Sequence, residues 1–508
     1  MTSPDTVMVE NGEAVPLTAL PVLSMDAFRA VVVGGVAHGR RVAALFAHGE
    51  QTTPAAPLDL LAVLTDEPTA SLVLARTRVE GGSFPSLTPE CTQVHLFERE
   101  IAEQFACIPV GHPWMKPVRF QAPCRHDPGA PRPPAPAVGV MDFYRVEGDE
   151  VHEVAVGPVH AGVIEPGHFR FQCHGERVFH LEISLGYQHR GIERRLVGGP
   201  DARTAHYMET LAGDTTIGHA TAYCHIVEGL AGVHAPARAQ FVRGIALELE
   251  RLANHCGDLG ALAGDVGFLP TASYCGRIRG DYLNMTALLC GNRFGRDLTR
   301  PGGVLFDIDD ARRAELLRRL AAAEKDTANA VNLLWDSPSV MARFEDTGRV
   351  DRELAADIGL VGPAARASGL ERDVRADFPK GVFRYSHIPV CIWETGDVFA
   401  RAHVRWLEIQ NSIRFVREEL ADLPDQPTIT AVPPLKPGQI AVSLVEGWRG
   451  EVCHVAITDD RGAFARYKVV DPSFHNWFGL AMALRNQEVS DFPLCNKSFN
   501  LSYCGFDL

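Results

Sequence analysis

The chain has 508 residues, of which 46% are hydrophobic and 22% charged, and its formal net charge is -14 at pH 7. This length exceeds what one hydrophobic core usually supports, so we expect two or three domains. The acidic balance argues against a nucleic-acid partner, which would need a basic surface. The acidic N-terminus predicts no signal peptide, and no segment approaches the roughly 18 apolar residues of a membrane-spanning helix.

The first part of the chain, residues 1–122, predicts a small α/β domain. Strands are expected at 41–49, 58–66 and 70–79, and a short amphipathic helix at 95–107. We expect the charged side chains Glu98, Arg99 and Glu100 of this helix on a solvated face. The run VVVGGVAHG at 31–39 lacks the GxGxxG spacing of a nucleotide-binding loop and is interpreted as a turn.

A proline-rich stretch, residues 123–139, predicts an extended linker and a domain boundary. The remainder, residues 140–508, begins with strands and a hairpin-like turn at 157–171. It then becomes mostly helical, with helices expected at 237–264, 310–334, 394–422 and 474–485 and antiparallel strands at 438–447, 451–459 and 465–470. The expected fold class is therefore α+β.

The twelve cysteines are scattered, and none forms a CxxC pair. This usage is typical of single buried thiols in a reducing compartment. Iron–sulfur clusters need grouped thiolates, so we expect this chain to bind none of its own. The hairpin histidines His160, His168 and His174 have no standard metal-ligand spacing, and structural roles are favoured for them.

Residues 206–232 show a long apolar-periodic helix pattern that is interrupted at 213–216 by a short polar segment, the polar knot. Polar residues recur among the apolar ones: Glu209, Asp214, His219, Cys224 and His225. A buried polar group without a partner costs about 1 to 3 kcal/mol. The segment is therefore predicted to line a polar pocket or a subunit interface.

Several longer motifs resemble known families. FEREIAEQF and IPVGHPWMKPVRF, within 97–120, resemble the end of the small peripheral-arm subunit of respiratory complex I. The chain from residue 157 onward resembles the large catalytic subunit of membrane-bound, formate-hydrogenlyase-type nickel–iron hydrogenases, which is homologous to the quinone-site subunit of complex I. The blocks that carry this likeness are GYQHRGIER at 186–194, VGPAARASGLERDVRAD at 361–377, EGWRGEVCHVAITD at 446–459 and DFPLCNKSF at 491–499.

In such hydrogenases four cysteines hold the nickel–iron centre, two in an ERxCGxC motif and two in a DPCxxC motif, because soft thiolates suit these metals. Here Ala212 and Thr215 stand at the first two ligand positions, and Ser502 and Gly505 at the last two. Cys504 lies one residue from the last position. We therefore expect no nickel–iron centre, no hydrogenase activity and no tail of the kind that is removed after metal insertion.

Complex I also lacks these cysteines, and the resemblance implies a quinone headgroup held by a tyrosine and a histidine in the vacated cavity. The tyrosine position falls on Gly213, whereas His160 and His168 are candidates for the histidine. Bonding to the hairpin backbone is an equally good explanation of either histidine. The candidate lining of a cofactor site is Gly213, Thr215, Ser502 and Cys504.

Two further groups are candidates for catalysis. Glu209, Asp214 and His219 are predicted to form a proton-transfer line, although capping of a broken helix explains Asp214 and Thr215 as well. Arg366 and Asp373, with Arg375 beside them, are predicted to form a charge network under the cavity. A purely structural ion pair is the favoured alternative for this second group.

The resemblance implies a peripheral subunit on the cytoplasmic side of the cell membrane, within a complex related to complex I. Electrons are expected from an iron–sulfur cluster in a small partner subunit, with a quinone as candidate acceptor, and membrane subunits are expected to move ions. The chain has no dinucleotide fingerprint, so a partner would have to bind NADH. The alternative is a non-catalytic scaffold whose cavity is plugged between 212–216 and 500–505.

Overall fold

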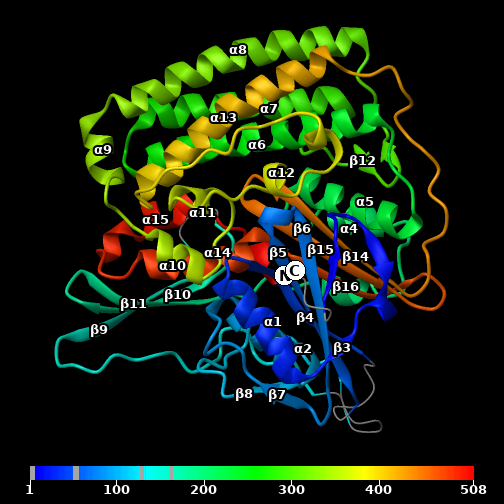
Figure 1. Cartoon of the computed structure of the whole chain (residues 1–508). Helices are drawn as coiled ribbons and strands as arrows, with labels where there is room; N and C mark the ends of the chain where they lie inside the picture. The colour runs from blue at the N-terminus through cyan, green and yellow to red at the C-terminus, as the bar shows by residue number, and fades with distance from the viewer. Residues whose placement is uncertain (1–5, 50–55, 126–130, 132, 161–163) are drawn as a thin grey trace.

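The computed structural model describes residues 6–49, 56–125, 131, 133–160 and 164–508. It is an α+β structure, as expected, with a sheet-rich N-terminal part below and a helical part above (Figure 1). No helix within the described residues is long and apolar enough to cross a membrane. All twelve cysteines are free thiols.

The N-terminal part is built on an antiparallel sheet of β4 (Arg41–His48), β5 (Leu58–Asp66) and β6 (Ser71–Val79), at the expected places. The strands β1 (Val7–Val9) and β3 (Val22–Leu23) both pair with β6. The interpretation of 31–39 as a turn was wrong, because these residues belong largely to α1 (Met25–Ala37). Gly35 lets α1 approach the sheet, since a Cβ there would lie 3.1 Å from Leu64 Cδ2.

The helix α2 (His95–Phe105) forms as expected, but its charged face is buried rather than solvated. Glu98 accepts a hydrogen bond of 2.6 Å from the backbone N–H of Leu87, and Arg99 donates one of 2.8 Å to the carbonyl of Lys116. Glu100 forms a salt bridge of 2.6 Å with Lys468. The prediction was wrong because segments outside α2 supply partners for all three charges.

The helical part is dominated by four long helices, which lie side by side at the top of Figure 1. They are α6 (Ala237–Asp265), α7 (Leu269–Cys290), α8 (Asp310–Trp335) and α13 (Val398–Ala421). Three of them were predicted. The helix α7 was not predicted, because glycines and polar residues scattered along it obscure the helical period.

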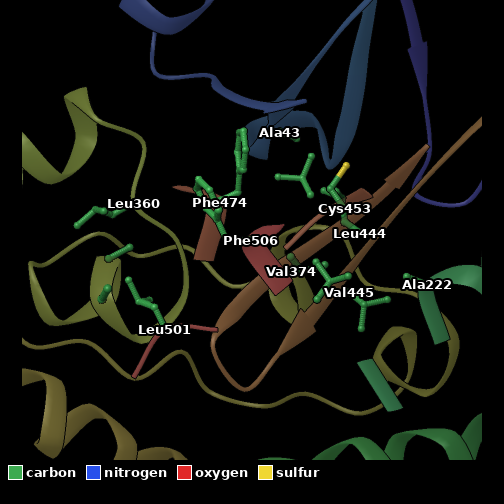
Figure 2. Close-up of a cluster of buried hydrophobic side chains, with 14 of the residues drawn as sticks. Ala43, Ala222, Leu360, Val374, Leu444, Val445, Cys453, Phe474, Leu501 and Phe506 are labelled. Carbon is green, nitrogen blue, oxygen red and sulfur yellow. The ribbon is translucent and has the colours of Figure 1, made fainter. Parts of the chain in front are cut away.

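A second antiparallel sheet lies between the two parts, in the strand order β16-β15-β14-β2. Three strands come from the C-terminal region, namely β14 (Gln439–Gly447), β15 (Gly450–Thr458) and β16 (Phe464–Val470), and β2 (Ala14–Pro16) comes from the N-terminus. Figure 2 shows Ala43 of β4 near Cys453 of β15, together with Phe474 and Phe506. The two parts therefore share one hydrophobic core.

Buried ion pairs also join the two parts. Lys468 of β16 lies 2.6 Å from Glu100 of α2 and 3.0 Å from Glu193 of α3 (Ile192–Arg195). Arg466 forms a further pair of 2.9 Å with Glu193, and Arg119 pairs with Glu100. Buried charges persist only when they are paired, so this network fixes the docking of α2 on β16.

The remaining elements surround these layers. The three-stranded sheet at 151–184 consists of β9 (Val151–Val156), β10 (His168–His174) and β11 (Arg177–Ser184). The other strands are short: β7 (Ser83–Pro85), β8 (Ile108–Val110), β12 (Thr299–Arg300) and β13 (Gly303–Val304). Further helices include α9 (Pro338–Phe344), α10 (Arg352–Asp357), α11 (Gly362–Ala367), α12 (Val374–Asp377), α14 (Pro472–Ala483), α15 (Phe492–Phe499) and α16 (Tyr503–Asp507).

Candidate functional site

The helix pattern at 206–232 is broken where the polar knot predicts, between α4 (Thr204–Met208) and α5 (Thr216–Ala231). The side chain of Thr215 does not cap α5. Instead, the Glu250 carboxylate of α6 accepts hydrogen bonds from the N–H groups of Ile217 (2.7 Å) and Gly218 (3.2 Å). Burial raises the pKa of Glu250 to about 8. Glu250 was not predicted as a site residue, because it lies within the regular apolar period of α6.

Asp214 is held by Arg449 from the turn between β14 and β15. Two hydrogen bonds of 2.6 and 2.7 Å join the guanidinium to both carboxylate oxygens. The guanidinium carbon of Arg449 lies 3.9 Å from the ring centroid of Trp448, and Nε donates to the Asn500 carbonyl at 2.6 Å. The Arg449 side chain therefore occupies space between residues 212–216 and the C-terminal motif at 500–505.

The four positions that correspond to metal-binding cysteines make other contacts. Ala212 is completely buried, and Thr215 Oγ1 accepts a hydrogen bond of 3.3 Å from Arg449. Ser502 Oγ accepts one of 2.9 Å from the N–H of Gly505, which caps α16. A Cβ at Gly505 would lie 2.6 Å from the Asp471 carboxylate. These residues offer no thiolate, and their surroundings do not fit a four-cysteine metal centre.

His219 lies in a chain of buried titratable side chains. Its Nε2 is 3.0 Å from Asp471 Oδ2, and its Nδ1 is 3.0 Å from His454 Nε2. His454 Nδ1 in turn lies 2.8 Å from the hydroxyl of Tyr467. Burial would raise the pKa of Asp471, yet the hydrogen bond from His219 holds that pKa below its usual value. Burial lowers the pKa of His454 well below its usual value.

Glu209 and Asp214 form hydrogen bonds with other residues than those that His219 contacts. Glu209 Oε1 accepts hydrogen bonds from Arg300 (2.6 Å) and from the N–H of Asp297 (2.8 Å). Among the described residues no hydrogen bond joins Glu209, Asp214 and His219 to one another. His206, Glu209 and Asp297 bring possible metal-ligand atoms within 4.8 Å, but Arg300 already pairs with both carboxylates.

The two candidate hairpin histidines both contact hairpin backbone. His160 Nε2 lies 3.2 Å from the carbonyl of Gly167, and His168 Nδ1 lies 3.2 Å from the carbonyl of Gly157. Residues 161–163 of this hairpin lie outside the described residues. The hairpin reaches the C-terminal motif at Gly167, where a Cβ would lie 2.6 Å from Tyr503 Cε1.

The exposed side of the site is formed by Gly213 and Cys504. Gly213 is exposed, and a Cβ there would have no atom within 4 Å. Cys504 is partly buried, with Sγ 3.4 Å from Ser502 Oγ. Burial raises the pKa of Cys504 to about 11, so its thiol is protonated at neutral pH. This surface is the open part of the candidate site.

Arg366 and Asp373 lie in a buried charge network. Arg366 forms salt bridges with Glu408 (2.7 Å) and Glu446 (2.8 Å) and lies 3.6 Å from Asp373. Burial opposes the charge of Arg366, but these carboxylates raise its pKa. Burial raises the pKa of Glu446 to about 7. The network extends through Arg375, which pairs with Asp373 at 2.6 Å.

The chain is similar to proteins of a known family. Residues 265–439 match the family described as "Respiratory-chain NADH dehydrogenase, 49 Kd subunit". Formate hydrogenlyase subunit 5 of Escherichia coli (strain K12) is 31% identical over 440 residues, which cover 83% of this chain and 76% of that protein.

Two further relatives are an NADH-quinone oxidoreductase subunit and a hydrogenase subunit. An NADH-quinone oxidoreductase subunit of Herpetosiphon aurantiacus is 30% identical over 356 residues, covering 69% of this chain and 96% of that protein. Membrane-bound hydrogenase subunit alpha of Pyrococcus furiosus is 28% identical over 365 residues, covering 68% of this chain and 85% of that protein.

Proposed function

Since the chain belongs to the family that unites the large subunits of formate-hydrogenlyase-type hydrogenases with the 49 kDa subunit of NADH dehydrogenase, we propose how it works within such a complex. It is a subunit of a membrane oxidoreductase complex. It takes electrons from an iron–sulfur cluster of a small partner subunit and passes them to an acceptor, with a quinone as the best candidate. It does so without a nickel–iron centre, from a peripheral position on the cytoplasmic side.

One observation supports redox chemistry most directly. The buried His219–Asp471 pair lies beside Gly505, the last of the four former metal-ligand positions. Reduction of a quinone to a quinol consumes two electrons and two protons, so a reducing site needs a proton supply. His219, Asp471 and His454 form a hydrogen-bonded chain of titratable groups suited to that task. The exposed surface at Gly213 and Cys504 is the proposed docking place of the iron–sulfur partner.

A second candidate function is that of a non-catalytic scaffold. The observation that favours it is the Arg449 side chain, which pairs with Asp214 and reaches Asn500 across the space between 212–216 and 500–505. A charged side chain held there by several hydrogen bonds resists displacement by an uncharged quinone headgroup.

The experiment starts from the native membrane complex, purified with its partner subunits. Metal analysis is expected to give far less than one nickel per chain, and stoichiometric nickel would contradict the proposal. Asp471→Asn keeps the shape of the side chain but removes its charge, and we expect quinone reduction to fall by about 10²-fold or more. His174→Gln, which changes an exposed hairpin histidine, is the matched control and should leave the rate unchanged.

Complex assembly separates the two candidates. Normal assembly with slow quinone reduction in Asp471→Asn supports the redox function. Normal assembly with an unchanged rate in Asp471→Asn, or no reduction of any acceptor by the unaltered complex with intact clusters, favours the scaffold.

A further inference from the structure

A cavity of about 540 Å³ lies alongside α5, lined by residues different from those of the 212–216 knot. Its walls come from residues 10–14, from α5 and α6, from β14 and from the segment 374–385. This volume lies within the range of sites that hold small organic ligands. Neither the electron-transfer function nor the scaffold function uses this cavity.

Two polar side chains from one face of α5, Thr221 and His225, line the cavity one helical turn apart. Thr221 is 6% exposed, and its hydroxyl has no hydrogen-bond partner in the part of the chain that the structure describes. His225 Nδ1 lies 3.4 Å from Ser443 Oγ. Burial lowers the pKa of His225 well below its usual value, so the ring is neutral at pH 7. A buried hydroxyl without a partner is costly, which favours a ligand that supplies one.

A cation from the opposite segment, Lys380, also lines the cavity. Its ammonium donates a hydrogen bond of 3.0 Å to the carbonyl of Asn11 and forms no salt bridge with any described residue. The carboxylates that act on it, Glu10 and Glu228, are each held by an arginine at 2.6 Å. Burial lowers the pKa of Lys380. An ammonium has three donors, so Lys380 retains the capacity to bind an anion.

Another part of the lining is apolar. Leu247, Phe378, Val382 and Val445 are buried and line the cavity. These side chains fit a ring or a short hydrocarbon rather than a fully hydrated ion.

We propose that this cavity binds a small organic carboxylate, with its carboxylate group on Lys380 and Thr221 and its apolar body against Phe378 and Val382. A monoanion is favoured over a phosphate because the cavity offers a single cation without a carboxylate partner among the described residues. Four glutamates, Glu10, Glu13, Glu228 and Glu446, also line the cavity and would repel a second negative charge. Three of them, Glu10, Glu228 and Glu446, are each paired with an arginine.

The test compares two ligands of nearly the same shape, 1-naphthoate and the uncharged 1-naphthamide, titrated into the full chain by calorimetry. We expect naphthoate to bind more tightly than naphthamide. Lys380→Met should weaken naphthoate binding about tenfold or more, which corresponds to roughly 1.4 kcal/mol, and should leave naphthamide binding unchanged. Lys436→Met is the matched control, because Lys436 is exposed and does not line the cavity.

Thr221→Val provides an independent variant of similar volume and should weaken naphthoate binding several-fold. It decides the question if Lys380→Met fails to fold, which circular dichroism would reveal. Equal affinity of the unaltered chain for the two ligands would overturn the proposal. So would an absence of naphthoate binding at millimolar concentration, or naphthoate affinity that is the same in a folded variant as in the unaltered chain.

Discussion

The guanidinium of Arg449 binds both carboxylate oxygens of Asp214, at 2.6 and 2.7 Å, across the site where the hydrogenase relatives of this chain are expected to carry metal-binding cysteines. Burial disfavours the charge of Arg449, but Asp214 raises its pKa. The pair therefore stays ionised, and it ties the 212–216 knot to the turn between β14 and β15.

Replacement of Arg449 by methionine should destabilise the protein by about 1 to 3 kcal/mol. The loss should be smaller than for a fully buried pair, because the Asp214 side chain is 33% exposed and water can solvate it. Urea unfolding followed by circular dichroism measures the change. Arg384→Met is the control, since the Arg384–Glu10 pair is well exposed and should contribute less than about 1 kcal/mol. Equal losses in the two variants would contradict the prediction.

Two glycines in the segments that correspond to the metal-ligand motifs should differ in their tolerance of alanine. Gly213→Ala should change stability by less than about 0.5 kcal/mol, because its Cβ meets no atom within 4 Å. Gly505→Ala should cost about 1 to 3 kcal/mol, because its Cβ would lie 2.6 Å from the Asp471 carboxylate. Thermal unfolding of both variants provides the measurement. A Gly505→Ala protein as stable as Gly213→Ala would show that Asp471 moves freely.

Much of the fold and part of the site could be predicted from the sequence, because both rest on local patterns. The break before α5 follows from a polar run inside an apolar period. The partner of Asp214 does not, because Arg449 lies 235 residues further along the chain. Likewise, an amphipathic pattern shows that α2 has a charged face, but only the packing of β16 supplies Lys468 to bury it.

In the candidate site, too, the partners of acidic and basic side chains could not be predicted from the sequence. Asp214 and His219 were identified from their place in the broken helix. Their side-chain partners come from the turn between β14 and β15, from β15 and from the start of α14. A single sequence does not reveal such pairings. Three of these missed groups, Glu250, His454 and Asp471, are buried and have displaced pKa values. Burial, which is a property of the packed structure, produces these environments.

Glu250 should make stability fall as the pH rises. Its pKa is about 8 in the folded protein, against an ordinary value of 4.5, chiefly because of burial, with the charge of Asp214 adding to the rise and Arg251 opposing it. The folded state therefore binds more protons than the unfolded state between about pH 4.5 and 8. The stability that this group contributes is present at low pH and is lost as the pH approaches 8.

Glu250→Gln removes this ionisation and should flatten the pH dependence of the unfolding free energy. We expect the stability difference between pH 5 and pH 8 to shrink by roughly 1 to 4 kcal/mol, as measured by urea unfolding at several pH values. Glu446, whose pKa is raised to about 7, should preserve part of the slope. An unchanged slope in Glu250→Gln would show that Glu250 ionises freely in the folded protein.

Lys468 should be among the most sensitive positions in the chain. It is completely buried and pairs with Glu100 and Glu193. Burial would raise the pKa of Glu193, yet Lys468, Arg466 and Arg119 lower it. Lys468→Met leaves two buried carboxylates with one fewer cation and should cost about 3 to 5 kcal/mol in urea unfolding. Because α2 and β16 belong to different parts of the chain, limited proteolysis should also detect looser docking of the N-terminal part.

A double variant tests whether unpaired charge, rather than lost packing, causes this effect. Glu100→Gln in the Lys468→Met background removes one of the stranded carboxylates, so the double variant should be more stable than Lys468→Met alone. Glu100→Gln alone should be destabilising, because it leaves Arg119 and Lys468 with one carboxylate fewer. Simple additivity of the two costs would mean that the ion pairs contribute little and that Lys468 acts through packing alone.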